Sequence, residues 1–160
     1  MSIKLTSPAF ENQQAIPERY SKGGGNISPP LAWTNVPETA KNLALIVDDP
    51  DAPKGVFVHW LVYGIRPSAK SLDEDLPASE TLIGGARQGR NGFGDLGYGG
   101  PQPPSGTHHY IFHLYALDTE LDLPPGADRQ KLDQAMRGHI LEEAQLTGTY
   151  QHRAPGSRAA

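Results

Sequence analysis

Eighteen glycines and fifteen prolines divide this 160-residue chain into short segments. They are not gathered into one stretch, as they would be in a linker, but are spread between apolar runs. This distribution is typical of short strands joined by tight loops. We therefore expect a mainly β fold in which glycine and proline mark the ends of strands.

Three apolar runs are the best candidates for strands. Residues 43–47 are continuously apolar, which suits a strand buried on both faces, and residues 56–65 are rich in β-branched and aromatic side chains. Residues 110–117 leave little surface for solvent. Weaker candidates lie at residues 3–7, 31–34 and 81–87.

One segment has the spacing of an amphipathic helix. After the Pro-Pro-Gly sequence at 124–126, the side chains that recur every three or four residues are Leu132, Ala135, Met136, His139, Ile140 and Ala144. Asp128 can cap the first turn and Gly148 can end the helix. We expect one helix, packed on a sheet near the C-terminus.

The length and charge of the chain limit its class. The chain is long enough for one domain with its own core, which we place at residues 1–151, and we expect a frayed tail at 152–160. The formal net charge of −4 argues against nucleic-acid binding, because that needs a basic face. No apolar run approaches the roughly 20 residues that span a bilayer, and no signal-peptide pattern is present. We expect a cytoplasmic protein without integral membrane association.

The chain contains no cysteine, which excludes disulfides, thiolate chemistry and cysteine-bound zinc. Any nucleophile must therefore be an oxygen or a nitrogen. Any metal would have to be held by histidine, aspartate or glutamate.

The first polar cluster directly follows the run that ends at Val47. Residues 48–53 read Asp-Asp-Pro-Asp-Ala-Pro, and the two prolines stop a strand and begin a rigid turn. Carboxylates fixed at a strand end make a good platform for a site. The alternative is an ordinary turn, because aspartate and proline are common turn residues.

His59 lies in the middle of the second apolar run. By strand alternation, Trp60 points the other way. The residues expected on the same face as His59 are Phe57, Leu61 and Tyr63. An ionisable ring among apolar side chains needs a partner or stays neutral. His59 is therefore either a site residue or a core histidine bonded to a backbone carbonyl.

The third cluster is a glycine- and proline-rich loop at residues 89–107, which leads into His108, His109 and Tyr110. Its glycines can bring backbone N–H groups close to an anion, and its prolines stiffen it. A Walker loop is excluded, because no Lys-Ser/Thr pair follows and no helix opens after it. Alternation puts His108 and Tyr110 on one face and His109 on the other.

The remaining basic side chains carry less weight. The histidines that we expect to be structural or solvated are His113 on the opposite strand face, His139 on the inner side of the helix, and His152 in the tail. The side chains that could line the rim of an anion pocket, or simply be solvated, are Arg87, Arg90 and Lys54.

Several motifs occur in a characteristic order. They are Asp-Pro-Asp-Ala-Pro at 49–53, His-Trp at 59–60, Gly-Gly-Pro-x-Pro-Pro-x-Gly at 99–106 and His-x-Tyr at 108–110. Together they resemble the phosphatidylethanolamine-binding protein family, and in particular its bacterial and archaeal Raf-kinase-inhibitor-like branch. The segments 26–33, 89–91 and 148–150 also look like that branch, so the resemblance covers about residues 5–150. His109 stands where the family usually has arginine, which puts the salt-bridging role of that position in question.

The resemblance implies a large, mainly antiparallel sheet, packed by a smaller sheet on one side and a helix on the other, as a β-sandwich with a pocket at the sheet edge. By matching positions, the ligand-binding residues are Asp49, His59, His108 and Tyr110, with Gly99, Gly100 and Pro101 as a wall. Asp51 is implied to brace the turn and Trp60 to pack beneath the pocket. Bacterial relatives are often homodimers, so a homodimer is implied as well.

These residues favour a protein that binds a small anion, such as phosphate or a phospholipid headgroup, with a regulatory role through a protein partner. Asp49 within reach of His59 or His108 would favour an imidazolium, which donates to the anion together with Tyr110. Anion affinity should then fall as the pH rises through a raised histidine pKa of about 7 to 8.

Two other functions stay open. One is a hydrolase in which the same aspartate and histidines act as acid and base or hold a metal. Neither a Gly-x-Ser-x-Gly elbow nor the histidine spacing of zinc proteases supports it. We therefore expect no catalytic residues, no metal and no other cofactor. The second is a kinase or protease inhibitor, which the family name implies.

Overall fold

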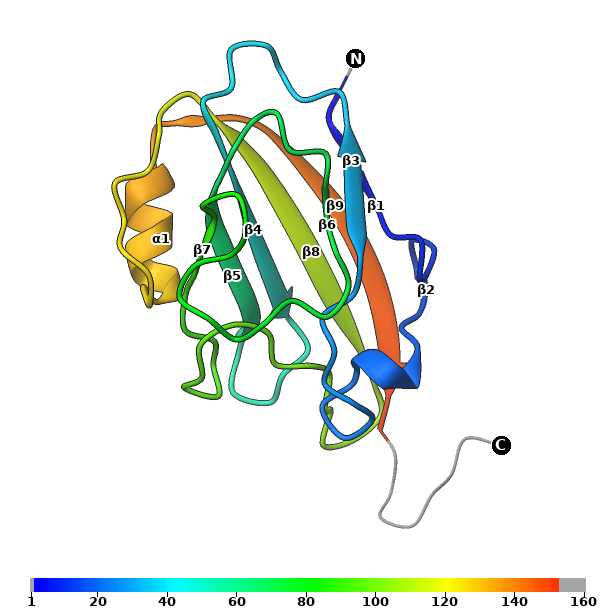
Figure 1. The fold of residues 1–160 in the computed structure, drawn as a ribbon. Coiled ribbons are helices and arrows are strands. Elements are labelled where there is room, and N and C mark those ends of the chain that lie inside the picture. The colour runs from blue at the N-terminus through cyan, green and yellow to red at the C-terminus, as the bar shows by residue number, and fades with distance from the viewer. Residues whose placement is uncertain (1, 153–160) are drawn as a thin grey trace.

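The computed structural model describes residues 2–152 and contains two β-sheets and one α-helix (Figure 1). The large sheet has the strand order β2 (Gln14–Ala15), β9 (Ile140–Gln151), β8 (Thr107–Leu117), β4 (Asn42–Asp49), β5 (Phe57–Ile65) and β7 (Arg87–Gln88). The smaller sheet has the order β1 (Lys4–Thr6), β3 (Leu31–Thr34) and β6 (Ser71–Leu72). The helices are the 3-10 turn η1 (Glu18–Tyr20) and α1 (Arg129–Met136).

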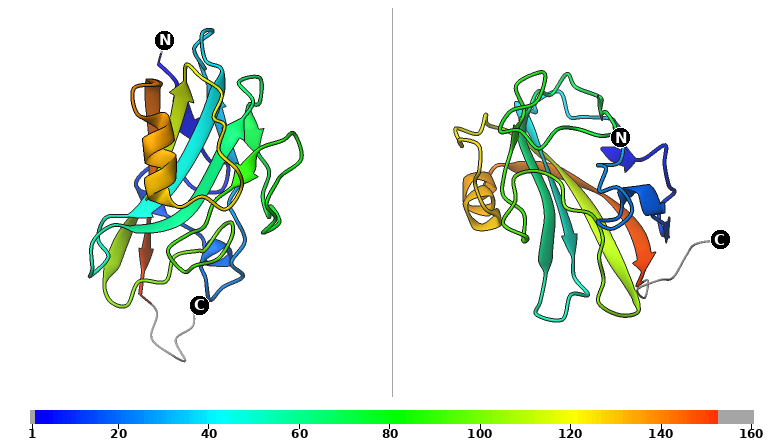
Figure 2. Two further views of the ribbon diagram at one scale, coloured as in Figure 1. Left: turned by 90° about the vertical axis from the view of Figure 1, so that its left-hand side faces the viewer. Right: turned by 60° about the horizontal axis from the view of Figure 1, so that its bottom comes forward.

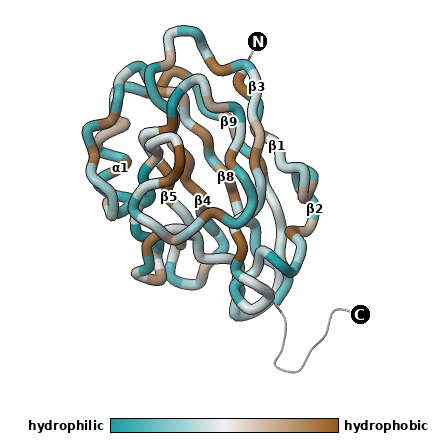
Figure 3. The backbone as a smooth tube through the Cα atoms, in the orientation of Figure 1, coloured by the Kyte–Doolittle hydropathy of each residue, from teal (hydrophilic) through white to brown (hydrophobic). Residues whose placement is uncertain are grey.

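All neighbouring strands are antiparallel except β2 and β9, which run parallel. The prediction of a mainly β, mainly antiparallel fold is therefore confirmed. The three apolar runs lie in β4, β5 and β8, and every residue of β4 is buried. Figure 3 shows apolar residues along these inner strands and hydrophilic residues in the surrounding loops. The candidate strand at 81–87 is instead a turn closed by one bridge, between Thr81 and Arg87.

A separate hydrophobic core lies on each face of the large sheet. The core between the two sheets contains Trp60 and Phe112, and the core beneath α1 contains Leu61, Tyr63 and Leu132. Figure 2 shows α1 against one face of the large sheet, with β1 and β3 on the other side. The predicted packing of the large sheet, by a smaller sheet and by a helix, is confirmed.

The helix is shorter than its spacing predicted. It begins as expected, because the Asp128 carboxylate accepts the backbone N–H of Lys131 at 2.9 Å. It ends at Met136, and Gly138, with a φ of +81°, turns the chain away. The prediction that the helix continues through His139 to the glycine at 148 was wrong, because the chain from 140 onward is strand β9, paired with β8.

The pattern in β9 explains the error. Ala144, Leu146 and Tyr150 are buried while Glu143 and Gln145 are exposed, which is the period of two of a strand. Ala144 fits both this pattern and the helical one. The pairing of β9 along the whole length of β8 outweighs the local helical spacing.

A β-bulge in β5 changes the direction in which His59 points. Val47 of β4 pairs with Trp60, but the next residue, Asp48, pairs with Val58. His59 is therefore the extra residue on β5. The strict alternation assumed from the sequence ends at this position.

The bulge has a clear effect on the neighbouring side chains. Trp60 packs in the core between the sheets, whereas Leu61 and Tyr63 pack beneath α1. The prediction that His59 shares a face with Leu61 and Tyr63 was wrong. His59 instead lies with Phe57, whose ring centroid is 5.1 Å away.

The end of the described chain is tied to the loop before β8. The backbone N–H of His152 donates to the carbonyl oxygen of Gly106 at 2.7 Å. The rest of the predicted tail, 153–160, lies outside the described residues, so a domain limit at 151 stays a prediction. None of the helices within 2–152 has the length and apolar character needed to cross a membrane.

Candidate functional site

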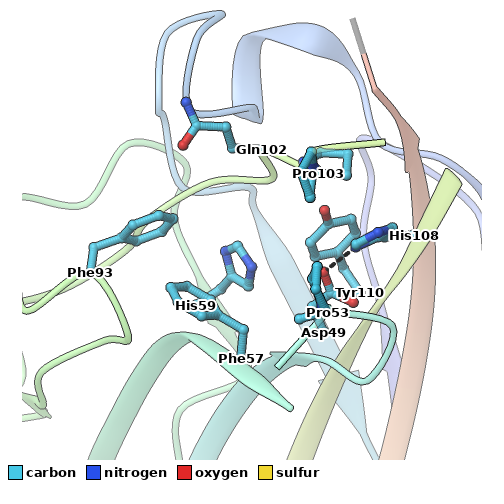
Figure 4. Close-up of a pocket in the computed structure, with 11 residues that line it drawn as sticks. Asp49, Pro53, Phe57, His59, Phe93, Gln102, Pro103, His108 and Tyr110 are labelled. Atoms are coloured by element: carbon cyan, nitrogen blue, oxygen red, sulfur yellow. Dashed lines mark hydrogen bonds and ion pairs between the residues drawn. The ribbon is translucent and has the colours of Figure 1, made fainter. Parts of the chain in front are cut away.

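A cavity of about 270 Å³ lies at the end of the large sheet, where β4 ends and β5 and β8 begin (Figure 4). Its lining residues are Asp49, Ala52, Pro53, Phe57, His59, Phe93, Gln102, Pro103, Pro104, His108 and Tyr110. The fold thus brings together the four predicted ligand-binding side chains, which come from three different strands.

Asp49 is fully engaged by its own neighbours. Its Oδ2 lies 2.6 Å from Nδ1 of His108, and its Oδ1 accepts the backbone N–H of Asp51 at 2.8 Å. Because a carboxylate only accepts, Nδ1 of His108 carries a proton and Nε2 is the ring nitrogen left for a ligand. Asp49 therefore orients His108 and braces the turn.

His59 is a neutral ring with one nitrogen already in use. Its Nδ1 lies 2.6 Å from the carbonyl oxygen of Gly99, so Nδ1 donates and Nε2 is left as an acceptor. Burial lowers the pKa of His59, and the backbone at Gly99 and Gly100 and the charge of Asp49 oppose this without cancelling it. The expectation of a raised histidine pKa is therefore wrong for His59.

The hydroxyl of Tyr110 is buried and has no hydrogen-bond partner, the one such side-chain atom within residues 2–152. Burial, followed by the negative charge of Asp49, raises the pKa of Tyr110, so the hydroxyl keeps its proton. The backbone of Gln102 opposes part of this rise, although it does not reach normal hydrogen-bond geometry. Tyr110 is thus a donor without an acceptor at the wall of the cavity.

Aromatic rings form much of the wall. The centroids of Phe57 and Phe93 are 4.7 Å apart, and those of His59 and Tyr110 are 5.1 Å apart. Both pairs meet edge to face, the geometry that aromatic pairs prefer. Sequence reasoning left Phe57 and Phe93 out of the site. With both rings in its wall, the cavity is more apolar than the sequence suggested.

Two glycines make room for these rings. A Cβ atom on Gly92 would lie 2.7 Å from the ring of Phe57, and one on Gly99 would lie 2.5 Å from the ring of Phe93. Both distances are too short for a real side chain. Glycines in this loop leave space for an aromatic ring. The one phenylalanine of the loop, Phe93, was the sequence feature that could have pointed to a ring in the cavity wall.

Residues 99–101, predicted to form a wall, are not among the residues that line the cavity. A Cβ atom on Gly100 would lie 2.3 Å from the carbonyl oxygen of Tyr20, and the carbonyl of Pro101 accepts the backbone N–H of Lys22 at 3.0 Å. This stretch therefore packs against the segment that follows η1. The next three residues contribute to the wall instead, and they are Gln102, Pro103 and Pro104.

Both residues expected to support the site have partners. Asp51 Oδ2 accepts the backbone N–H of His109 at 2.7 Å and lies 2.8 Å from its Nδ1. These hydrogen bonds lower the pKa of Asp51, so His109 keeps a pairing role at the position where the family has arginine. Trp60 is fully buried and donates its indole N–H to Gln88 at 2.8 Å.

Two basic side chains singled out from the sequence lie away from the cavity. His113 is on the opposite face of β8, as predicted, between Asp48 at 3.2 Å and Glu143 at 2.8 Å. Arg87 donates to the carbonyl of Leu123 at 2.7 Å and so does not line a rim.

Several polar groups of the cavity already have partners within the protein. Asp49 and His108 pair with each other, while His59 bonds to a backbone carbonyl. Within the described part of the chain, no group of three or more histidine, aspartate and glutamate side chains could hold a metal ion. The arrangement therefore lends no support to a metal-assisted hydrolase.

Comparison with known proteins identifies the family. Residues 6–151 match the family model described as phosphatidylethanolamine-binding protein. The chain is 52% identical over 148 residues to a UPF0098 protein of Methanothermobacter thermautotrophicus, covering 92% of this chain and 98% of that protein. It is 45% identical over 151 residues to a UPF0098 protein of Aquifex aeolicus, covering 92% and 88%.

Solved structures agree with this match. The crystal structure of a phosphatidylethanolamine-binding protein homologue from Chlamydia trachomatis superposes with a TM-score of 0.87 at 41% identity, covering 95% of this chain and 99% of that one. Escherichia coli YbcL, described as a new member of the mammalian family, gives a TM-score of 0.89 at 31% identity, with coverage of 96% and 100%. The chain therefore belongs to the phosphatidylethanolamine-binding protein family.

Proposed function

We propose that this protein binds a small anion with an apolar substituent, such as a phosphate monoester, in the cavity at the ends of β4, β5 and β8. The observation that carries the proposal is the buried, unpaired hydroxyl of Tyr110. A buried donor without a partner costs about 1–3 kcal/mol, which a ligand oxygen can offset. Because Tyr110 keeps its proton, it suits an anion rather than a cation.

The other cavity groups suit the same ligand. The neutral ring of His59 offers Nε2 as an acceptor, which can receive the hydrogen of a singly protonated phosphate. Phe57, Phe93 and Pro103 offer apolar surface to a substituent. The family name points to a ligand of this kind, since a phospholipid headgroup is itself a phosphate ester.

The test is calorimetric binding of inorganic phosphate and phenyl phosphate to the wild type, Tyr110→Phe and Tyr115→Phe. Phenyl phosphate should bind more tightly than phosphate, and Tyr110→Phe should weaken both by about tenfold or more, the value of a hydrogen bond to a charged group. Tyr115 lies on the same strand but packs beneath α1, so its variant should bind like the wild type.

Absence of binding to the wild type at tens of millimolar would contradict the proposal. Equal affinity of Tyr110→Phe and wild type would remove the observation on which it rests. Release of phosphate from phenyl phosphate in the same samples would favour the hydrolase alternative.

The finer parts of the proposal rest on the family alone. They are a homodimer and regulation of a kinase or protease through a protein partner. Light scattering coupled to size-exclusion chromatography tests the first of these directly.

A further inference from the structure

The cavity of the proposed function holds no free positive charge of its own. Asp49 occupies the Nδ1 side of His108, and burial keeps His59 neutral. The two arginines expected near a rim are engaged elsewhere, Arg87 with backbone carbonyls beneath the helix and Arg90 with the carbonyl of Gly94. An anion in this cavity would therefore need its countercharge from another part of the chain.

Lys22 is placed to supply it. Its ammonium nitrogen lies 3.8 Å from the centroid of the Phe93 ring, and Phe93 lines the cavity. Among the described residues no carboxylate forms an ion pair with Lys22. The ammonium is thus held by an aromatic face alone.

The backbone fixes Lys22 at this place. Its N–H donates to the carbonyl of Pro101 at 3.0 Å, which ties it to the loop that continues into the cavity wall. The Phe93 ring is held in turn by the rings of Phe57 and His59, at centroid distances of 4.7 and 5.6 Å. Lysine and cavity are therefore parts of one packed unit.

We propose that Lys22 provides the countercharge for the anion and makes the cavity prefer anionic over neutral ligands. This inference rests on the proposed function. The lysine stem is flexible and its ammonium has three donors, so it can turn from the ring towards an anion oxygen. A charge-assisted hydrogen bond of that kind is stronger than a cation–π contact at a partly exposed position.

The experiment compares wild type, Lys22→Met and Lys22→Arg in calorimetric binding of phenyl phosphate and of phenol, its neutral counterpart. Lys22→Met keeps the apolar stem against Phe93 and removes the charge. It should weaken phenyl phosphate roughly five- to tenfold and leave phenol unchanged, while Lys22→Arg keeps most of the affinity. Added salt should weaken binding to the wild type more than to Lys22→Met, because salt screens the charge of Lys22, which the variant lacks.

Lys131→Met is the matched control and should bind like the wild type, since Lys131 lies in α1, on the face of the large sheet opposite the smaller sheet (Figure 2). Lys54→Met tests the competing lysine, since Lys54 directly follows the lining residue Pro53 and has no partner among the described interactions of the fold. It too should bind like the wild type. A loss with Lys54→Met instead of Lys22→Met, or equal affinities of Lys22→Met and wild type, would overturn the assignment of Lys22.

The two proposals fail in different ways. If phenyl phosphate does not bind the wild type, both are wrong. If it binds, and Tyr110→Phe weakens it while Lys22→Met does not, only the assignment of Lys22 is wrong. Unfolding midpoints measured for each variant identify any loss of binding caused by misfolding.

Discussion

The polar residues of the cavity differ in the hydrogen bonds that they still have to offer. Both oxygens of Asp49 are in use, whereas Tyr110 has a donor without a partner. His59 lies between these cases, because its remaining nitrogen accepts when the ring is neutral and donates when it is protonated. A response of the cavity to pH can therefore arise at His59.

We predict that affinity for phenyl sulfate, an anion of constant charge, rises several-fold as the pH falls from about 8 to 5. The pKa of His59 is lowered from 6.5, so the ring gains its proton, and becomes a donor to the anion, only below that pH. Calorimetry across this range checks the prediction. His59→Gln should give a flatter profile, and coincident profiles would show that another group titrates.

The sequence identified these residues but did not predict their protonation states. Asp49, His59, His108 and Tyr110 follow from motifs, and all four line the cavity. The lowered pKa of His59 arises from burial by chain segments remote in sequence, which no local pattern contains. Phe93 was missed for the same reason, because only the folded loop brings it to the cavity.

Among the elements, the loop before β8 and the segment after η1 depend on each other. Gly100 donates its backbone N–H to Asn26 Oδ1 at 2.7 Å, and the Tyr98 hydroxyl donates to the carbonyl of Tyr20 at 2.7 Å. The two backbones approach so closely that only glycine fits between them. Gly100 thus serves packing between segments rather than direct contact with an anion.

We predict that Gly100→Ala lowers the free energy of unfolding by about 1–3 kcal/mol, the usual cost of overpacking. Its Cβ atom would meet the backbone of Tyr20 at 2.3 Å, and backbone yields less easily than the end of a side chain. Urea denaturation measures the change. Gly23→Ala is the control, because nothing lies within 4 Å of its Cβ position, and equal stabilities of the two variants would contradict the close packing.

Periodicity predicted the elements well where one pattern stood alone. β3 matches the expected run at 31–34, β4 and β8 contain two of the long runs, and β5 contains the third apart from its first residue, Val56. It failed at 140–148, where the buried Ala144 fits helix and strand alike and pairing with β8 decides. It failed again at His59, because a bulge depends on the register of the neighbouring strand.

At the scale of the whole molecule, the end of β4 connects the two faces of the large sheet. Asp49 faces the cavity and pairs with His108, while Asp48 faces the helix and lies 3.2 Å from His113 and 3.0 Å from Arg129. The carboxylates of Asp48 and Asp49 thus lie on opposite faces of the large sheet, and each is paired with a histidine of strand β8. The end of β4 therefore contributes both to the docking of α1 and to the geometry of the cavity.

The last prediction concerns this link and the pH dependence of stability. Burial lowers the pKa of His113, but hydrogen bonds and charges from Asp48 and Glu143 outweigh it, so the pKa is raised above 6.5. A raised pKa in the folded state means that the stabilisation is fully present below 6.5 and is lost as the pH rises through the folded value. Burial raises the pKa of Asp48, and His113 and Arg129 more than reverse this, so its contribution is lost as the pH falls through its own lowered pKa.

We therefore expect His113→Gln to lower the free energy of unfolding by about 1–2 kcal/mol near pH 6, with the difference shrinking towards alkaline pH. Taking the difference from wild type in urea denaturation at each pH cancels the groups common to both proteins. His139→Gln is the control, since its pair with Asp118 is nearly half exposed and should contribute less than about 1 kcal/mol. A pH-independent difference for His113→Gln would mean that His113 stabilises the fold through packing and not through the charged form of its ring.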